Sequence, residues 1–293
     1  MKEALRLLLK RVAFFVLAFV AVSVLTVIGY QVEQVQEAHA DADVGVALPV
    51  VMYHSVLKDP QRAGKFVVSP RVFEQDLQYL KDEGYTAVLV EDLIAYVNRQ
   101  ADLPEKPVLI TLDDGYYNNL TYVLPILERL DMKAVISVVG EYTVRFSEAK
   151  DLNPNYAHLS WDDINVLRQS GRIEIQNHSY GLHTDQNGRK GSMRKSGESL
   201  EAYRKVFLED TQKLQELLQE NCGFRPAAYV YPYGAISDES TGFLKEMGFA
   251  ASFTCYEKIN YITRDNNSLF RLGRFNRPSN LTTAEFMEKI LTD

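Results

Sequence analysis

The sequence predicts an α/β fold, namely a closed or nearly closed (β/α) barrel of about seven parallel strands, preceded by an N-terminal transmembrane helix. From residue 48 onward, short apolar runs typical of buried strands alternate with amphipathic segments typical of helices. About seven or eight such units in roughly 245 residues suit a closed or nearly closed barrel. Before them, residues 12–30 form an uncharged apolar run about as long as a bilayer-spanning helix.

The charges on either side of the apolar run predict how it lies in a membrane. Residues 1–11 carry its basic flank, and Glu33 is the first acidic residue after it. This asymmetry predicts a cytoplasmic tail, a single anchor and an extracellular remainder. The triplet "AHA" at 38–40 has the form of a signal-peptide cleavage site, and cleavage would release the protein. The length of the apolar run favours the uncleaved anchor.

A stalk and a single catalytic domain are expected after the anchor. Residues 31–47 are polar or small without a clear period, so they predict the stalk, and residues 48–293 predict the domain. The first half of the domain contains strands at 48–54, 85–90, 106–112 and 133–139, and helices at 69–84, 91–99 and 118–130. In the first of these helices Ser69 is the expected N-cap, Pro70 the first helical residue and Gly84 the stop.

The second half of the domain continues the alternation. Its predicted strands are 172–178, 227–234 and 249–255, and its predicted helices are 160–171, 198–221, 239–248 and 282–291. The formal net charge of −7 argues against a nucleic-acid partner, which would require a basic face. Cys222 and Cys255 are too few for a disulfide framework, and buried thiols are the favoured interpretation, with a single bridge left open.

Polar residues gather at the predicted carboxyl ends of strands, where (β/α) barrels carry their chemistry. These residues are His54, Asp113, Asp114, His178 and Tyr233. His183 follows His178 by five positions in a loop. Two imidazoles and one carboxylate leave a fourth position open, which is typical of a catalytic zinc site.

The motifs "TLDDG", "HSYGLH" and "YPYG" together resemble the polysaccharide deacetylases of carbohydrate esterase family 4, the NodB-homology domain, over about residues 48–275. The resemblance implies a distorted (β/α) barrel and metal-dependent removal of acetyl groups from N-acetylglucosamine units. It implies that Asp113 is the catalytic base and that Asp114, His178 and His183 bind the metal, most simply Zn²⁺. It also implies that the Tyr233 N–H contributes to the oxyanion hole.

The sequence departs from the family pattern in three places. The two histidines are one residue further apart than usual, a form similar to the branch that acts on poly-N-acetylglucosamine. The usual arginine before the "PYG" motif is missing, so Arg271 or Arg274 is expected to supply a supporting cation. No histidine follows His183, and the resemblance to that branch suggests His54 as the general acid.

The aromatic residues Tyr116 and Trp161 are candidates for lining a sugar groove. The expected substrate is an extracellular N-acetylglucosamine polysaccharide, with poly-N-acetylglucosamine favoured and peptidoglycan as the alternative. An alternative of another class is a non-catalytic, membrane-anchored glycan-binding protein. The intact set of two aspartates and two histidines argues against it, because a binding protein needs no open metal site.

Overall fold

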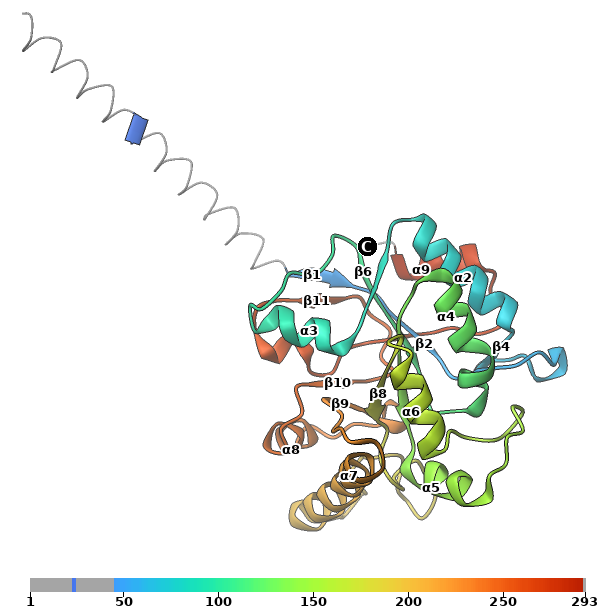
Figure 1. Cartoon of the computed structure of the whole chain (residues 1–293). Coiled ribbons are helices and arrows are strands. Elements are labelled where there is room, and N and C mark those ends of the chain that lie inside the picture. The colour runs from blue at the N-terminus through green and yellow to red at the C-terminus, as the bar shows by residue number, and fades with distance from the viewer. Residues whose placement is uncertain (1–22, 25–44, 292–293) are drawn as a thin grey trace, which may run out of the picture. The chain divides into compact units, whose positions relative to one another are not determined.

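The computed structural model describes residues 23–24 and 45–291 (Figure 1). Most of the expected anchor at 12–30 and of the stalk at 31–47, and the whole tail at 1–11, lie outside these residues. Within the described residues no helix combines the length and the apolar character that a membrane crossing needs.

The chain divides into two units, Met1–Gly45 and Val46–Asp293. In the first unit, Ser23 and Val24 are helical. The second unit contains the predicted domain and is described from here on.

A parallel sheet forms the centre of the domain, as the sequence predicts. Its strand order within the described residues is β10-β9-β8-β7-β6-β2-β12, and β5 pairs with β6 beside this path. The strands are β2 (Val50–Tyr53), β5 (Thr86–Val88), β6 (Pro107–Leu112), β7 (Ala134–Val138), β8 (Ile173–Asn177), β9 (Ala228–Val230), β10 (Ala251–Phe253) and β12 (Phe275–Asn276). The prediction of about seven parallel strands in an α/β fold is therefore confirmed.

The segment that leads into β12 connects the two ends of the strand order. Leu272 pairs with β10, because its N–H donates to the Ser252 carbonyl at 2.8 Å and its carbonyl accepts from the Thr254 N–H at 2.8 Å. A few residues later, Phe275 and Asn276 pair with β2. One short stretch thus runs from β10 to β2. Its side chains lie between these two strands, where the strand order of the described residues does not close into a complete barrel.

Helices cover the outside of the sheet, and Figure 1 shows α2 and α9 lying side by side. The helices are α2 (Pro70–Asp82), α3 (Val90–Val97), α4 (Leu124–Leu130), α5 (Gly140–Ala149), α6 (Trp161–Gln169), α7 (Leu200–Cys222), α8 (Ser240–Glu246) and α9 (Thr283–Leu291). Ser69 caps α2 as predicted, since its side chain accepts from the Val72 N–H at 3.2 Å. Ser160 and Asp163 form a capping box at the start of α6.

The apolar run of β6 is explained by burial on both faces. Val108, Ile110 and Leu112 belong to the cluster that packs under the outer helices, whereas Leu109 belongs to a second cluster on the other face. Successive side chains point to opposite sides of a strand, so a strand covered on both sides needs apolar residues throughout.

Some elements differ from the expectation. The helix α5 and the short strands β1 (Val46–Leu48), β3 (Ser55–Val56), β4 (Val67–Val68) and β11 (Asn260–Ile262) were not predicted. The strand expected over 227–234 ends at Val230, and a 3₁₀ turn follows at Pro232–Gly234. Pro232 fixes its own φ, and Tyr233 has φ +58°, which is incompatible with a strand.

Candidate active site

Asp113 and Asp114 follow β6 but point in different directions. The Asp113 N–H still donates to the Tyr53 carbonyl of β2 at 3.0 Å, whereas Asp114 has φ +71° and Gly115 has φ +63°. Two successive left-handed residues turn the chain sharply, so the two carboxylates separate. A Cβ on Gly115 would lie 2.9 Å from Val138 Cγ1, so the position requires glycine.

Asp114, His178 and His183 converge on one point. Their potential ligand atoms lie within 4.8 Å of one another. Asp114 Oδ1 lies 3.5 Å from His178 Nε2 and 3.1 Å from His183 Nε2, yet no described residue satisfies it with a well-formed hydrogen bond. A buried, orphaned carboxylate oxygen facing two imidazole nitrogens fits a divalent cation, because these are donors that zinc accepts.

The two imidazoles are held to different degrees. His178 is 2% exposed, and its Nδ1 donates to the Val230 carbonyl at 2.8 Å. In a neutral imidazole this bond places the proton on Nδ1, so Nε2, which faces Asp114 Oδ1, is the nitrogen free to bind a metal. Among the described residues, His183 has only a long contact on its other nitrogen, 3.4 Å between Nδ1 and the Tyr233 hydroxyl.

A buried arginine holds the Asp113 carboxylate. Arg274 Nη1 donates to Asp113 Oδ1 and Nη2 donates to Oδ2, both at 2.7 Å. The Ser137 hydroxyl also donates to Oδ1 at 2.8 Å. Burial alone would raise the pKa of Asp113, but the Arg274 guanidinium outweighs it and lowers the pKa well below the usual range. Asp113 is therefore an ionised carboxylate beside Asp114, His178 and His183, the candidate metal-ligand set.

His54 follows β2 at the same end of the sheet. Its ring packs against Phe66 with centroids 4.7 Å apart, and its buried Nδ1 has no hydrogen-bond partner among the described residues. Burial lowers the pKa of His54, although the charges of Asp113 and Asp114 act in the opposite direction. His54 is therefore close enough for the charges of both aspartates to affect its pKa.

Two of the predicted tyrosines also border the metal-ligand set. The ring of Tyr233 lies 4.6 Å from the ring of His183, and the side chain is 44% exposed. The Tyr233 N–H makes no hydrogen bond to any residue that the structure describes. Burial and the nearby charge of the Asp114 carboxylate raise the pKa of Tyr116, so this side chain lies beside Asp114.

Arg271 and Trp161 are not brought to this site. Arg271 donates to Thr241 and forms an exposed ion pair with Asp238 at 3.1 Å. Trp161 is partly buried against the outer core, and its backbone N–H donates to the Ser147 hydroxyl at 3.0 Å. Of the two arginines proposed as the supporting cation, only Arg274 reaches Asp113.

His158, to which the sequence analysis gives no role, lies directly beside the site. Its Nδ1 donates to the Asp114 carbonyl at 2.8 Å, and its ring stacks on Tyr116 with centroids 4.6 Å apart. Tyr142, on α5, lies against the other rings, 4.5 Å from His158 and 6.1 Å from His183. In the sequence, the only feature that could have drawn attention to His158 was the scarcity of histidine, with five in the chain.

The two cysteines are free. Cys222 ends α7, whereas Cys255 lies behind the site, with its Sγ 3.8 Å from Arg274 Nη2. The expectation of thiols rather than a bridge is confirmed, but both cysteines are partly buried rather than buried.

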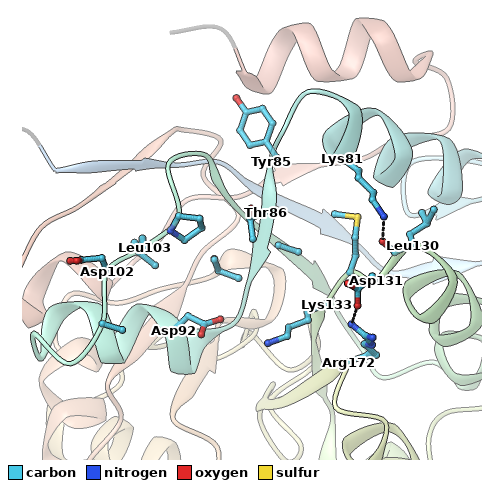
Figure 2. Close-up of a pocket in the computed structure, with 15 residues that line it drawn as sticks. Lys81, Tyr85, Thr86, Asp92, Asp102, Leu103, Leu130, Asp131, Lys133 and Arg172 are labelled. Atoms are coloured by element: carbon cyan, nitrogen blue, oxygen red, sulfur yellow. Dashed lines mark hydrogen bonds and ion pairs between the residues drawn. The ribbon is translucent and has the colours of Figure 1, made fainter.

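A separate hollow lies at the amino ends of the strands (Figure 2). Its lining includes residues that come just before β6, β7 and β8, such as Pro104, Lys133 and Arg172. Figure 2 shows Arg172 paired with Asp131, at a distance of 2.5 Å. None of the candidate catalytic residues lines this hollow, since they follow the carboxyl ends of the strands.

Known proteins share this fold and this sequence pattern. The sequence profile of the family described as Polysaccharide deacetylase matches residues 100–252. The chain is 23% identical over 262 residues to poly-beta-1,6-N-acetyl-D-glucosamine N-deacetylase of Escherichia coli strain K12, covering 83% of this chain but only 38% of that relative. It is 23% identical to the protein of the same name from Staphylococcus epidermidis, covering 76% of this chain and 73% of the relative.

Solved structures agree with this relationship. A de-N-acetylase from Aggregatibacter actinomycetemcomitans has a TM-score of 0.70 at 24% identity, covering 83% of this chain and 99% of that chain, which shows a shared fold. IcaB from Ammonifex degensii has a TM-score of 0.66 at 25% identity, covering 84% and 97%. Because the family profile matches more than half of its residues, the chain belongs to the polysaccharide deacetylase family of hydrolases.

Proposed function

We propose that the protein removes N-acetyl groups from N-acetylglucosamine units of an extracellular polysaccharide, in a metal-dependent reaction that releases acetate. The observation that carries this proposal is the convergence of Asp114, His178 and His183 beside an ionised Asp113. Poly-N-acetylglucosamine is the favoured substrate, because relatives from two bacteria bear the name of deacetylases of that polymer.

Asp114, His178 and His183 would hold the cation, for which their mixed nitrogen and oxygen donors favour zinc. A divalent cation at this point supplies Lewis-acid polarisation of the acetyl carbonyl and acidifies a water molecule.

Asp113 is suited to be the general base. Arg274 keeps its carboxylate unprotonated, and a base must be unprotonated to accept the proton of the attacking water. Asp113 Oδ2 accepts only one hydrogen bond from a described residue, that of Arg274 Nη2, so a lone pair remains for this proton. General-base catalysis of this kind contributes about 10²–10⁴-fold to the rate.

Two further groups complete the proposed reaction. The left-handed conformation of Tyr233 leaves its N–H without a partner among the described residues, so this N–H can donate to the oxyanion of the tetrahedral intermediate. His54 would donate a proton to the departing amine. Its lowered pKa makes its protonated form a stronger acid, while the two nearby carboxylates favour that form. Tyr116 would contact the sugar or the acetyl group.

The location of the reaction is part of the proposal. The basic residues before the apolar run at 12–30 support a single membrane anchor with the catalytic domain outside the cell. Cleavage after "AHA" would instead release the domain.

The test is acetate release by the full-length chain in detergent, after chelation and again after zinc is restored. β-1,6-linked N-acetylglucosamine oligomers, β-1,4-linked oligomers and peptidoglycan would be compared side by side. Zinc-dependent release from the β-1,6 oligomers is the expected result. Acetate release from peptidoglycan alone would indicate that the protein is a peptidoglycan deacetylase that modifies the cell wall. Zinc binding without release from any of the three would support a glycan-binding protein instead.

A further inference from the structure

The least constrained metal ligand is His183. His178 directly follows β8 and is fixed by its bond to the Val230 carbonyl, but His183 stands at the far end of the loop 179–182. Among the described residues, its Nδ1 has only the 3.4 Å contact with the Tyr233 hydroxyl, while its Nε2 faces Asp114 Oδ1 at 3.1 Å. The position of His183 Nε2 therefore depends on how the backbone of this loop is held.

The carbonyls of the loop are held by the first turn of α5. The Gly140 N–H donates to the Ser179 carbonyl at 3.0 Å, and the Glu141 N–H donates to the Tyr180 carbonyl at 2.9 Å. Gly140 allows this close approach, because a Cβ there would lie 2.7 Å from the Tyr180 ring. These bonds orient the first two peptides but leave the N–H groups of the loop pointing away from α5.

Asp210 on α7 receives those N–H groups. Tyr180 N–H donates to Asp210 Oδ1 at 2.8 Å, and Gly181 N–H donates to Oδ2 at 2.7 Å. Among the described residues, Asp210 is the only side chain outside 177–183 that accepts from the N–H groups of loop 179–182. Hydrogen bonds to a charged acceptor are about twice as strong as neutral ones.

The helix keeps Asp210 in place. Its neighbours Phe207, Thr211 and Leu214 are fully buried, so this part of α7 is anchored in the domain. The Thr211 carbonyl also accepts from Asn177 Nδ2 at 3.2 Å, which ties α7 to the end of β8. The carboxylate thus connects a rigid helix to the loop between the two histidines.

We infer that Asp210 is a positioning residue that holds His183 in ligand geometry and thereby sets the affinity of the site for its cation. This inference rests on the proposed metal-dependent function. The extra residue between the two histidines lengthens the loop, and Asp210 binds the loop near its middle. Loss of a group that hydrogen-bonds a metal ligand directly typically lowers metal affinity by about 10–100-fold, and we expect an effect in this range when the loop that carries His183 loses Asp210.

The experiment measures zinc binding by the full-length chain with a competing chelator, together with the thermal midpoint of the zinc-free protein and acetate release at limiting and saturating zinc. Asp210→Asn is the near-isosteric variant. Glu209→Gln is the matched control, because it makes the same charge change one position earlier on α7, where the side chain is 67% exposed. Asp210→Glu keeps the charge and displaces the carboxylate, so it serves if the Asn variant does not fold.

Asp210→Asn is expected to bind zinc about 10–100-fold more weakly and to regain turnover when zinc is raised. The zinc affinity of Asp210→Glu is expected to lie between those of Asp210→Asn and the wild type. The zinc affinity of Glu209→Gln is expected to match that of the wild type. A folded Asp210→Asn protein with an unchanged zinc dissociation constant would overturn the inference, even with a lowered thermal midpoint. A wild type that binds zinc but releases no acetate would refute the proposed function and leave the role of Asp210 standing.

Discussion

Replacing Arg274 with methionine is expected to cost both stability and activity. The guanidinium is fully buried and forms two 2.7 Å hydrogen bonds to the Asp113 carboxylate. Removing one partner of a buried ion pair leaves an uncompensated charge, which costs about 3–5 kcal/mol. The pKa of Asp113 would also rise, because Arg274 is the main group that lowers it. A protonated Asp113 cannot act as a base, so turnover should fall by about 10²–10⁴-fold.

The assay is urea unfolding of Arg274→Met together with acetate release by the protein that remains folded. Arg271→Met is the matched control, since it breaks an exposed ion pair with Asp238 and should change neither quantity measurably. The double variant Arg274→Met with Asp113→Leu should regain much of the lost stability, because no unpaired charge is left, but should stay inactive. Wild-type stability and turnover in Arg274→Met would refute the reasoning.

Three further predictions follow from single contacts. Asp113→Asn should keep zinc affinity while turnover falls about 10²–10⁴-fold, and loss of zinc from this variant would mean that Asp113 and Asp114 have exchanged roles. Burial raises the pKa of Glu174 from 4.5 to about 7. The native state then binds the proton more tightly, so the contribution of Glu174 to stability is fully present below pH 4.5 and is lost, by up to about 3 kcal/mol, as the pH rises from 4.5 through 7. Glu174→Gln should lack this decline in urea unfolding, and an equal decline in both proteins would contradict the assignment. Arg277→Met should destabilise the fold by about 3–5 kcal/mol through its buried pair with Asp76, without reducing turnover of folded protein; a loss of turnover comparable to that of Arg274→Met would argue otherwise.

The positions of the candidate site residues could be predicted because they follow local rules. Asp113 and His178 each follow a strand, and the carboxyl ends of neighbouring parallel strands meet at one edge. Side chains alternate along a strand, so two successive residues at its end, such as Asp113 and Asp114, point in different directions. The structure adds that left-handed geometry at Asp114 and Gly115 increases the separation.

The partners that hold these residues could not be predicted, because they come from distant parts of the chain. Arg271 and Arg274 stand three positions apart in "RLGRFNR", and nothing local says which one faces the barrel interior. His158 precedes α6 and reaches Asp114 only through the packing of its ring on Tyr116. Asp210 is one of several charged residues along α7, and its role depends on where that helix crosses the loop.

The segment that closes the barrel explains why two buried arginines lie so close together. In an extended chain, residues three positions apart face opposite sides, as Arg274 and Arg277 do. Arg274 reaches inward to Asp113, whereas Arg277 donates to Asp76 of α2 at 2.7 Å and to the Leu281 carbonyl at 2.9 Å. The same stretch is thus bound to the active site on one side and to the outer helices on the other. Closure of the barrel and ionisation of Asp113 therefore depend on one segment. A chain in which this segment does not dock should lose the ionised Asp113 carboxylate while its parallel sheet is still folded.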